Sequence, residues 1–390
     1  MEKFLMLLIE LFLIFVISVM AAGLVISFSN NRLIKSFSDY ELNGESPFVS
    51  ILVPARNEED NIEACLNSLL AQEYPNFEVV VLNDNSTDRT GAILAQLAKT
   101  NSRLRVINGS PLPEGWPGKH WACQQLSQTA RGDLFLFTDA DTRHSPQALR
   151  HAVAALLQEK VDLLTAIPRE EVVSWGEKLI VPFMSFGIQS FLPIGLAQKK
   201  RIPAFSVTIG QFMLFRREVY EAIGGYKEAC SNINDDVLLG RTLMQKGYRW
   251  CLLDGTDYVS CRMYHNFSDT VEGFSKNVFG FFDYRIFPFV LVWCAVAAIF
   301  LGPLRILTGG ILANQFFSTA PRLALIAVLE MLLLFFIAYR RLGIPLYMTL
   351  FYWLTITLFV LVAMRSMVLS LTGHASWKGR TLKNVEIRWI

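Results

Sequence analysis

Apolar residues are concentrated at the two ends of this 390-residue chain. The run Phe4–Phe28 is apolar apart from Glu10. Because a helix needs about 20 apolar residues to cross a bilayer, this run predicts a transmembrane anchor over residues 1–30. A cleaved signal peptide has a shorter apolar region and a small-residue cleavage site, so we expect the anchor to be retained. Arg32 and Lys35 follow it and predict that the next segment lies in the cytoplasm.

A second membrane region is predicted over residues 286–371. Its apolar runs are Ile286–Leu304, Leu323–Tyr339 and Ile344–Leu371. Arg340 and Arg341 would form a basic turn on the cytoplasmic face between the last two runs.

The tail over residues 372–390 raises a problem of parity. If each run crosses once, the tail lies outside, yet its basic residues favour the inside: Lys378, Arg380, Lys383 and Arg388. Either the stretch from Ile286 to about Phe317 is a hairpin or a re-entrant segment, or the tail breaks the rule. The sequence leaves both alternatives open.

Residues 46–265 alternate strand and helix patterns. Helical spacing occurs over Asn61–Ala71 and over about Asp88–Lys99. This alternation predicts an α/β domain of the Rossmann-like type with a mostly parallel sheet, flanked by transmembrane helices. Residues 266–285 would be an interfacial connector to the membrane region. The expected strands are Phe48–Val53, which Pro54 would stop, Phe77–Leu82, Leu104–Ile107 and Asp133–Thr138.

Residues 181–197 are apolar but too interrupted for a simple membrane span. We interpret them as an interfacial segment that covers the site and admits a lipid acceptor. A hydrophobic core helix is the alternative. The interruptions are Pro182, Gly187, Pro193 and Gly195.

Composition narrows the class of protein further. Hydrophobic residues make up 52% of the chain, and the net charge of +2 lacks the basic stripe of a nucleic-acid-binding protein. The six cysteines form no CxxC pair and no zinc-binding spacing, which is typical of ordinary thiols in a reducing compartment.

Polar segments follow each expected strand. They are Pro54–Asn57, Asn83–Asp88, Gly115–Lys119 and the pair formed by Asp139 and Asp141. In parallel sheets ligands bind at the carboxyl ends of the strands, so four such segments at one edge predict a binding site.

Asp139 and Asp141 present two carboxylates at the exit of a buried strand. Such hard oxygen ligands suit Mn²⁺ or Mg²⁺, and without a cation the two charges would repel each other. A solvated acidic turn is the alternative for an isolated pair of this kind.

The motifs occur in the order VPARNEEDNI, NDNSTDRT, GKHWA, TDAD, a Gly-Gly-Tyr segment and NDDVLLGR. This ordered set resembles the family 2 glycosyltransferases of the GT-A fold, across residues 46–265. The membrane segments, GWPGKHWA and the closing WKGR resemble the lipid-directed branch, which includes ceramide, hopanoid-associated and carotenoid (diaponeurosporenoate-type) glycosyltransferases.

The resemblance implies a role for each acidic residue. Asp84 would accept a hydrogen bond from the imide N–H of uracil. Asp141, with Asp139 beside it, would hold the metal on the diphosphate of the nucleotide-sugar. Asp236 would be the general base that deprotonates the acceptor, with inversion at the anomeric carbon. A helix cap is the alternative for Asp236. Lys119 would add a cation near the phosphates, or would be a surface lysine.

Further residues are implied as nucleotide-sugar ligands: Pro54, Arg56, Asn57 and Glu58. His265 would be a third metal ligand, or else a packed or capping residue. The Q/R-x-x-R-W motif of processive synthases and ceramide glucosyltransferases is missing, because that stretch reads Glu272-Gly-Phe-Ser-Lys276-Asn277. Lys276 would still serve the leaving diphosphate.

The prediction is a multi-pass enzyme of the cell membrane with a cytoplasmic catalytic domain. It would move one sugar from a nucleotide-sugar, a UDP-sugar by the resemblance, to a lipid such as an apocarotenoid or a hopanoid. Two alternatives stay open, namely a processive polysaccharide synthase and a non-catalytic nucleotide-sugar-binding membrane protein.

Overall fold

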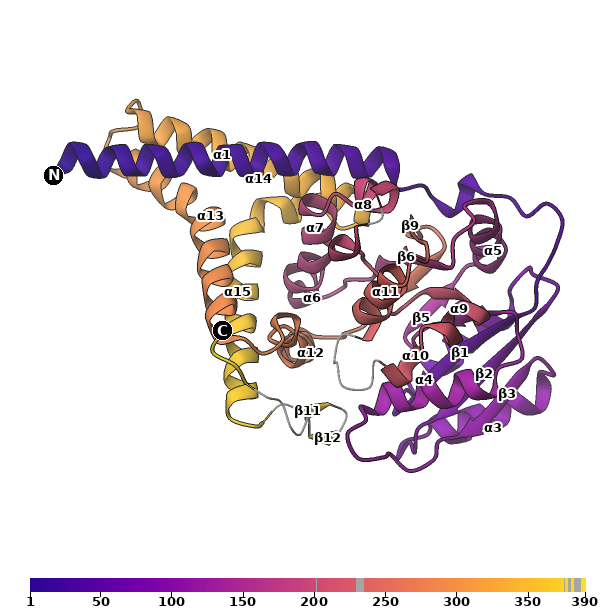
Figure 1. Ribbon diagram of the computed structural model, residues 1–390. Helices are drawn as coiled ribbons and strands as arrows, with labels where there is room; N and C mark the ends of the chain where they lie inside the picture. The colour runs from indigo at the N-terminus through magenta and orange to yellow at the C-terminus, as the bar shows by residue number, and fades with distance from the viewer. Residues whose placement is uncertain (201, 229–234, 375, 378–379, 382–386) are drawn as a thin grey trace. The chain divides into compact units, whose positions relative to one another are not determined.

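A computed structural model describes the chain except for residues 201, 229–234, 375, 378–379 and 382–386 (Figure 1). The described chain divides into two compact units. The α/β unit contains residues 33–171 and 194–263, and the helical unit contains residues 1–32, 172–193 and 264–390. Asn234 of the expected helix start and Lys378 and Lys383 of the tail lie outside the described residues.

A seven-stranded sheet forms the centre of the α/β unit, in the order β3-β2-β1-β4-β8-β6-β9. Strand β8 alone among these runs antiparallel to its neighbours β4 and β6. The predicted mostly parallel sheet is therefore confirmed. The strands are β1 (Val49–Ala55), β2 (Phe77–Asn83), β3 (Leu104–Asn108), β4 (Leu134–Phe137), β6 (Leu163–Ile167), β8 (Met213–Arg216) and β9 (Trp250–Asp254).

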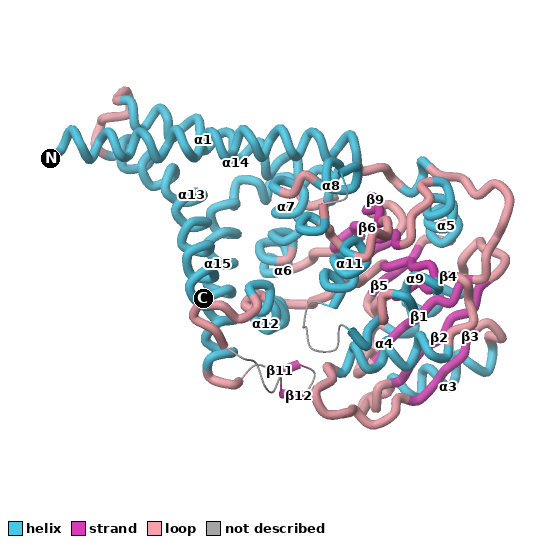
Figure 2. Tube along the Cα trace, in the orientation of Figure 1, coloured by secondary structure: helices cyan, strands magenta, loops and turns pink. Residues whose placement is uncertain are grey.

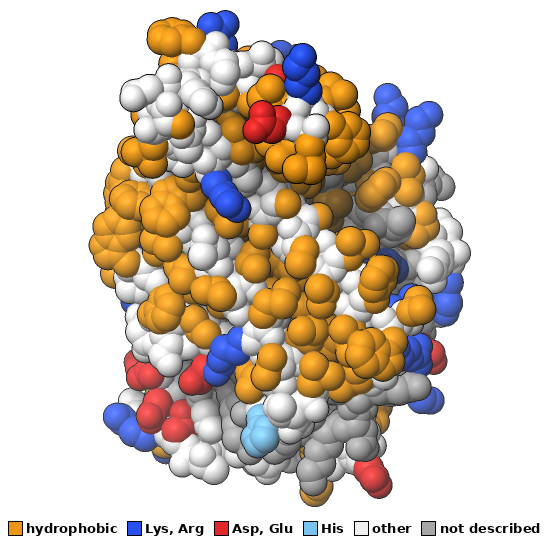
Figure 3. Space-filling model, turned by 90° about the vertical axis from the view of Figure 1, so that its left-hand side faces the viewer, with side chains coloured by type: hydrophobic (Ala, Val, Ile, Leu, Met, Phe, Trp, Pro, Cys, Tyr) orange, Lys and Arg blue, Asp and Glu red, His pale blue; other side chains and the backbone are white. Residues whose placement is uncertain are grey.

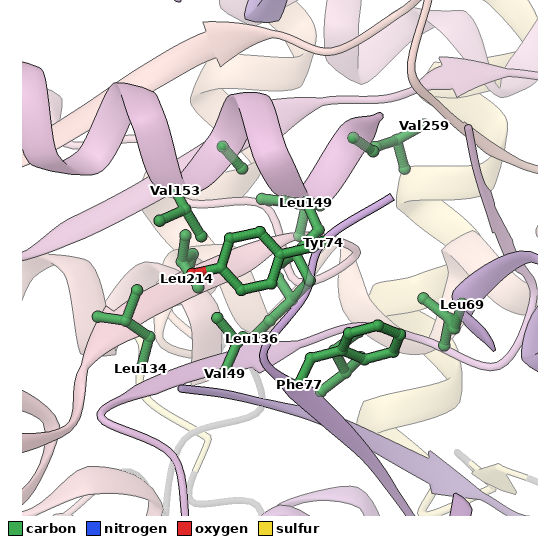
Figure 4. Close-up of a cluster of buried hydrophobic side chains, with 14 of the residues drawn as sticks. Val49, Leu69, Tyr74, Phe77, Leu134, Leu136, Leu149, Val153, Leu214 and Val259 are labelled. Atoms are coloured by element: carbon green, nitrogen blue, oxygen red, sulfur yellow. The ribbon is translucent and has the colours of Figure 1, made fainter. Parts of the chain in front are cut away.

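Helices cover both faces of this sheet. Successive side chains of β4 point to opposite faces, so this strand packs against both layers of helices. On one face Leu134 and Leu136 belong to a buried cluster, and Figure 4 shows the ring of Tyr74 among Leu149, Val153 and strand residues. On the other face Phe135 and Phe137 pack edge-on and tilted against the Tyr220 ring. The helices are α2 (Ile62–Leu70), α3 (Thr90–Thr100), α4 (Gly118–Thr129), α5 (Ala148–Gln158), α8 (Ile194–Lys200), α9 (Arg217–Ala222), α10 (Gly225–Glu228) and α11 (Asp235–Gln245).

Strand β1 continues through Pro54 to Ala55, so the expectation that Pro54 stops it was wrong. The reason lies in the hydrogen bonds between β1 and its two neighbouring strands. The carbonyl of Leu52 accepts from Thr138 on the β4 side, whereas that of Ala55 accepts from Asp84 on the β2 side. Pro54 therefore turns its missing N–H towards β4, whose pairing with β1 ends at Leu52. No ladder hydrogen bond is lost there.

A small three-stranded sheet lies next in the α/β unit, in the order β5-β10-β7. Its register pairs Thr142 with Cys261 and His144 with Val259. Two 3₁₀ turns complete the unit. The elements are β5 (Thr142–His144), β7 (Arg169–Glu170), β10 (Val259–Cys261), η1 (Phe37–Asp39) and η2 (Pro203–Phe205).

The helical unit is built from long apolar helices. Within the described residues, four are long and apolar enough to cross a membrane: Glu2–Leu33, Ile286–Leu312, Thr319–Leu342 and Leu346–Leu371. Figure 3 shows one face on which apolar side chains predominate. The elements are α1 (Glu2–Leu33), α6 (Trp175–Ile180), α7 (Pro182–Phe191), α12 (Phe267–Asn277), η3 (Gly280–Phe282), α13 (Ile286–Leu312), α14 (Thr319–Leu342), η4 (Leu346–Phe351), α15 (Tyr352–Leu371), β11 (Ser376–Trp377) and β12 (Arg380–Thr381).

Helix α1 buries one stripe of side chains at alternating spacings of three and four residues, which is the seam of a packed helix. At its polar end Asn30 Nδ2 donates to the carbonyls of Gln189 (2.9 Å) and Leu192 (2.8 Å). Arg341 Nη1 donates to the carbonyl of Asn30 (3.0 Å). The C-terminal ends of α1 and α14 therefore lie together. The buried stripe is Leu13, Val16, Met20, Gly23, Ser27 and Asn30.

Two features of the C-terminal region bear on its predicted topology. The stretch after Ile286 is one helix, α13, which continues through Pro303, so the hairpin alternative is excluded. The predicted basic turn at Arg340 and Arg341 is the last turn of α14, which ends at Leu342 before Gly343 with φ 72°. Cations at a helix C-terminus interact favourably with its dipole.

Helices α13 and α15 lie side by side and run in opposite directions (Figure 2). Near the end of α15, Ser366 Oγ accepts a hydrogen bond from Phe279 N (3.0 Å), just before α13 begins. Ile286 N, at the start of α13, donates to the carbonyl of Arg388 (2.9 Å). The end of the tail therefore returns to the start of α13.

The interrupted apolar segment is divided between α7 and α8, with Pro193 between them. Phe186 of α7 is buried and stacks on Phe335 of α14 at 3.9 Å between ring centroids. This part of the segment is a packed helix of the helical unit.

Candidate functional site

Three loops converge at the carboxyl ends of β1, β2 and β3. Arg56 Nη1 donates to the carbonyls of Asp84 (2.7 Å) and Asn85 (3.3 Å). Gly109, after β3, donates its N–H to the carbonyl of Asn83 (2.9 Å). A Cβ at Gly109 would lie 3.3 Å from Asp84 Cα, so this close approach favours glycine. Asp84 is buried at the meeting point.

The loop after β1 is further tied to the start of α3. Asn57 takes the left-handed conformation (φ 51°), which asparagine tolerates well, and its side-chain oxygen accepts from Thr87 N (2.9 Å). Glu58 N donates to Thr90 Oγ1 (2.8 Å). Pro54 lies in the last part of β1, at the base of this loop. The predicted nucleotide-sugar residues of the first two loops thus form one hydrogen-bonded group.

Asp139 and Asp141 lie on the turn between β4 and β5. Lys119 Nζ, from the first turn of α4, lies 2.6 Å from Asp139 Oδ1. Cys261, on the neighbouring strand β10, donates from Sγ to Asp141 Oδ1 (3.5 Å). Two different connections of the fold therefore bring a lysine and a thiol to the acidic pair.

Negative charge is unfavourable at the acidic pair. Burial raises the pKa of Asp141, and the nearby Asp139 and Glu58 raise it further, while Lys119 acts in the opposite direction. A bound cation would offset this unfavourable charge. Within the described parts of the chain, no three His, Cys, Asp or Glu side chains are grouped closely enough to hold a metal by themselves. The pair fits the usual Mg²⁺ arrangement of one or two carboxylates completed by substrate phosphates and water.

Asp236 is brought to the same place by the loop before β8. Gly210 N donates to Asp236 Oδ2 (3.1 Å). A Cβ built on Gly210 would lie 3.6 Å from both Asp236 Oδ2 and Lys119 Nζ. Gly210 therefore separates the carboxylate of Asp236 from the ammonium that pairs with Asp139, and a side chain at this position would fill the space between them.

The orientation of Asp236 is fixed from two sides. The hydroxyl of Thr208 donates to the backbone carbonyl of Asp236. Val237 N, in the first turn of α11, donates to Asp236 Oδ1 (2.7 Å). A carboxylate in the first turn is also favoured by the helix dipole. A capping role and a chemical role for Asp236 are compatible, since Oδ1 accepts from the helix and Oδ2 points to Gly210.

The structure thus places nine of the residues predicted for the site in the α/β unit. They are Pro54, Arg56, Asn57, Glu58, Asp84, Lys119, Asp139, Asp141 and Asp236. His265 and Lys276 belong to the helical unit and stay predictions for the site. Sequence reasoning did not single out Cys261 or Thr208, because neither follows a predicted strand. Gly210 was not singled out either.

Known proteins resemble the α/β unit. Residues 50–224 match the model of the family described as Glycosyl transferase family 2. These residues are a family 2 glycosyltransferase domain. The predicted family resemblance is therefore confirmed.

Two kinds of relative extend the comparison. A beta-monoglucosyldiacylglycerol synthase of Nostoc sp. is 32% identical over 202 residues, which cover 50% of this chain and 41% of that protein. A 4,4'-diaponeurosporenoate glycosyltransferase of Staphylococcus haemolyticus is 27% identical over 259 residues, covering 64% of this chain and 66% of that protein. The chain thus matches less than two thirds of the length of each.

One solved structure resembles the described fold over nearly its whole length. A mannosyltransferase of Pyrobaculum calidifontis, solved in complex with GDP-Man and Mn²⁺, aligns with a TM-score of 0.56 at 18% identity. The alignment covers 93% of this chain and 99% of that one. At this identity the likeness shows the fold, and it agrees with the predicted GT-A architecture.

Proposed function

We propose that this chain is a membrane-bound, metal-dependent, inverting glycosyltransferase. It moves a single sugar from a nucleotide-sugar, most simply a UDP-sugar, to a hydrophobic lipid such as an apocarotenoid or a hopanoid. The observation that carries the proposal is that Lys119, which pairs with Asp139 of the acidic pair, lies with Asp236 around Gly210. Residues 46–265 are the proposed catalytic domain.

The nucleotide is proposed to bind over the carboxyl ends of β1 and β2. The carboxylate of the buried Asp84 offers an acceptor for the imide N–H of uracil. Arg56 donates to the backbone carbonyl of the same residue. A hydrogen bond to a charged group contributes about 1.5–3 kcal/mol, which is enough to select a base with a matching donor.

The diphosphate is proposed to lie between Asp139 and Lys119. A divalent cation held by Asp141 and Asp139 would neutralise the charge that develops as the nucleoside diphosphate leaves. The Staphylococcus relative is named as a glycosyltransferase and the Nostoc relative as a monoglucosyldiacylglycerol synthase, and the Pyrobaculum mannosyltransferase was solved with Mn²⁺. Lys119 would exchange its bond to Asp139 for one to a phosphate oxygen.

Asp236 is proposed as the general base. Its Oδ2 faces Gly210, so an acceptor hydroxyl seated there can transfer its proton to this oxygen as it attacks the sugar. The diphosphate leaves from the side of Lys119 and Asp139. One displacement, with nucleophile and leaving group on opposite faces of the anomeric carbon, inverts the configuration.

The lipid acceptor and the membrane location are supported by the helical unit and by the names of the two relatives. Arg32 and Arg341 lie at the joined ends of α1 and α14, which we propose to be the cytoplasmic side. Because Arg388 returns to the start of α13, the basic tail is proposed to lie on the side from which α13 begins. This position agrees with the basic residues of the tail but not with a count of three separate crossings after residue 285.

The proposal is tested with purified full-length protein in detergent. The protein is incubated with Mn²⁺, a panel of UDP-sugars with GDP-mannose for comparison, and a total lipid extract, and the lipids are analysed by mass spectrometry. A mass increment of one sugar on a lipid supports the proposal. A ladder of repeated increments would instead indicate a processive synthase, and no increment with any donor would contradict the proposal.

A further inference from the structure

Three polar side chains meet beneath the Asp139–Asp141 turn. His144 Nε2 lies 3.0 Å from Thr138 Oγ1 and 3.2 Å from Thr142 Oγ1, and the two hydroxyl oxygens are 2.9 Å apart. The two threonines border the turn on either side. None of the three belongs to the metal, nucleotide or base roles described above.

The direction of these hydrogen bonds follows from counting protons. Thr138 Oγ1 donates to the carbonyl of Gln211 (2.8 Å), and Thr142 Oγ1 donates to the carbonyl of Asp139 (2.7 Å). A carbonyl can only accept, so each hydroxyl has used its single proton. The thiol of Cys65 lies 4.0 Å from Thr142 Oγ1 but donates over a shorter distance to the carbonyl of Asp139 (3.7 Å), so the proton shared within the triangle comes from the ring. His144 therefore carries its proton on Nε2 and shares it between the two hydroxyl oxygens.

The ring is held firmly in this orientation. His144 is only 6% exposed, and its ring lies 5.7 Å from that of Phe212 between centroids. Its backbone N–H donates to Ser68 Oγ (3.1 Å), which ties β5 to α2. Burial, with a smaller effect of Arg143, lowers the pKa of His144 to about 3, so the ring is neutral at physiological pH.

We propose that His144 is a positioning residue that fixes the conformation of the Asp139–Asp141 turn through its shared Nε2–H. Without that proton, two oxygens 2.9 Å apart would face each other with lone pairs only, and one hydroxyl would have to leave its carbonyl. If the Thr142 hydroxyl turns away, the carbonyl of Asp139 loses its shortest hydrogen bond (2.7 Å) and keeps the longer ones from Thr142 N (3.3 Å) and Cys65 Sγ (3.7 Å), so the turn relaxes. The proposal rests on the proposed function in one respect, namely that the turn holds a divalent cation.

The first test compares His144→Gln with His144→Phe. Glutamine places an amide N–H near the position of Nε2, whereas phenylalanine fills the site without a donor. Mn²⁺ binding is measured by calorimetry in the presence of UDP, together with the unfolding temperature in detergent. Loss of a residue that supports metal ligands typically costs about 10–100-fold in affinity. We expect such a loss for His144→Phe, and a change of less than about threefold for His144→Gln.

A matched pair at Thr142 serves if His144→Phe does not fold. Thr142→Ser keeps the hydroxyl that bonds Asp139, and Thr142→Val removes it at equal volume. Only Thr142→Val should weaken Mn²⁺ binding. Folded His144→Phe or Thr142→Val protein that binds Mn²⁺ like the wild type would overturn the positioning role.

The tautomer is measured without any reliance on activity. ¹⁵N spectra of the histidine-labelled wild type, assigned by comparison with His144→Gln, should show a neutral ring protonated at Nε2. A proton on Nδ1, or a charged ring, would overturn the inference. Wild-type protein that binds no Mn²⁺ would refute the metal site itself, and the tautomer would still decide whether His144 holds the turn.

Discussion

Lys119 Nζ lies 2.6 Å from Asp139 Oδ1, which gives one carboxylate of the acidic pair a cationic partner from a different connection of the fold. The two side chains are 38% and 22% exposed, so the pair is open to solvent and to ligands. A surface pair of this kind contributes little to stability, about 0–1 kcal/mol. We therefore attribute its importance to binding.

Replacing this lysine should separate donor binding from metal binding. In Lys119→Met the KM for the nucleotide-sugar should rise about tenfold or more, because a charge-assisted bond to phosphate contributes about 1.5–3 kcal/mol. The Mn²⁺ concentration needed for half-maximal activity should not rise, since a competing cation is removed from Asp139. Steady-state rates at varied donor and Mn²⁺ concentrations measure both. Lys99→Met on the exposed end of α3 is the control. An unchanged KM would make Lys119 a surface lysine.

Removal of divalent metal should abolish activity. Transfer is expected to stop in EDTA and to return with Mn²⁺ or Mg²⁺. Burial and acidic neighbours raise the pKa of Asp141, so the charged form of this carboxylate needs a cation beside it. Asp141→Asn should lose more activity than Asp139→Asn, since the carboxylate of Asp139 also has Lys119 as a partner. Full turnover in chelator would contradict the metal assignment. Asp141→Asn with parental activity would exclude that residue from the site.

Asp84→Ala should weaken UDP binding while the protein remains folded. The lost hydrogen bond corresponds to about 10–150-fold in Kd, from about 1.5–3 kcal/mol. Calorimetric titration with UDP measures the change, with unfolding temperature as the check on folding. Asp257→Ala, which removes a carboxylate that is 75% exposed, is the matched control. Equal affinity of Asp84→Ala and wild type would refute the uracil contact.

The C-terminus should report a cytoplasmic location. The carbonyl of Arg388 accepts from Ile286 N at the start of α13, so we expect both ends of this contact to lie on one side of the membrane. A C-terminal green fluorescent protein fusion should therefore fluoresce in cells, and a C-terminal alkaline phosphatase fusion should be inactive. The opposite result would place the tail outside, as a count of three separate crossings suggests.

Much of the fold could be predicted from sequence because its signals are local. Apolar strands, helical spacing and the polar residues that follow each strand are read within a few residues, and the sheet places Asp84 and Asp139 at one edge. Pro54 was misjudged because its tolerance depends on where the neighbouring strand β4 ends. The hairpin alternative after Ile286 came from the count of membrane crossings, whereas α13 continues through Pro303 as one helix.

The site was less predictable because its central contacts join distant segments. Gly210 meets Lys119 and Asp236 only because β8 runs antiparallel beside β4, with Met213 opposite Phe137. Cys261 reaches Asp141 through the pairing of β10 with β5. Neither pairing has a local signature in the sequence. The position of the proton on His144 was also not predictable, because it follows from the distances between the ring and the hydroxyls of Thr138 and Thr142.

Asp236 is proposed to remove the acceptor's proton during an inverting transfer. A lipid alcohol must lose its proton as it attacks, and general-base assistance contributes typically about 10²–10⁴-fold. A carotenoid carboxylic acid is already ionised near pH 7 and needs little help from a base. Asp236 is therefore expected to matter far more for an alcohol acceptor than for an acid.

The most direct measurement is the single-turnover rate of Asp236→Asn with matched alcohol and carboxylic acid acceptors, together with the anomeric configuration of the product. We expect an inverted product, near-complete loss of transfer to the alcohol and a substantial remaining rate with the acid. Retention of configuration, or an equal large loss with both acceptors, would contradict the general-base role of Asp236.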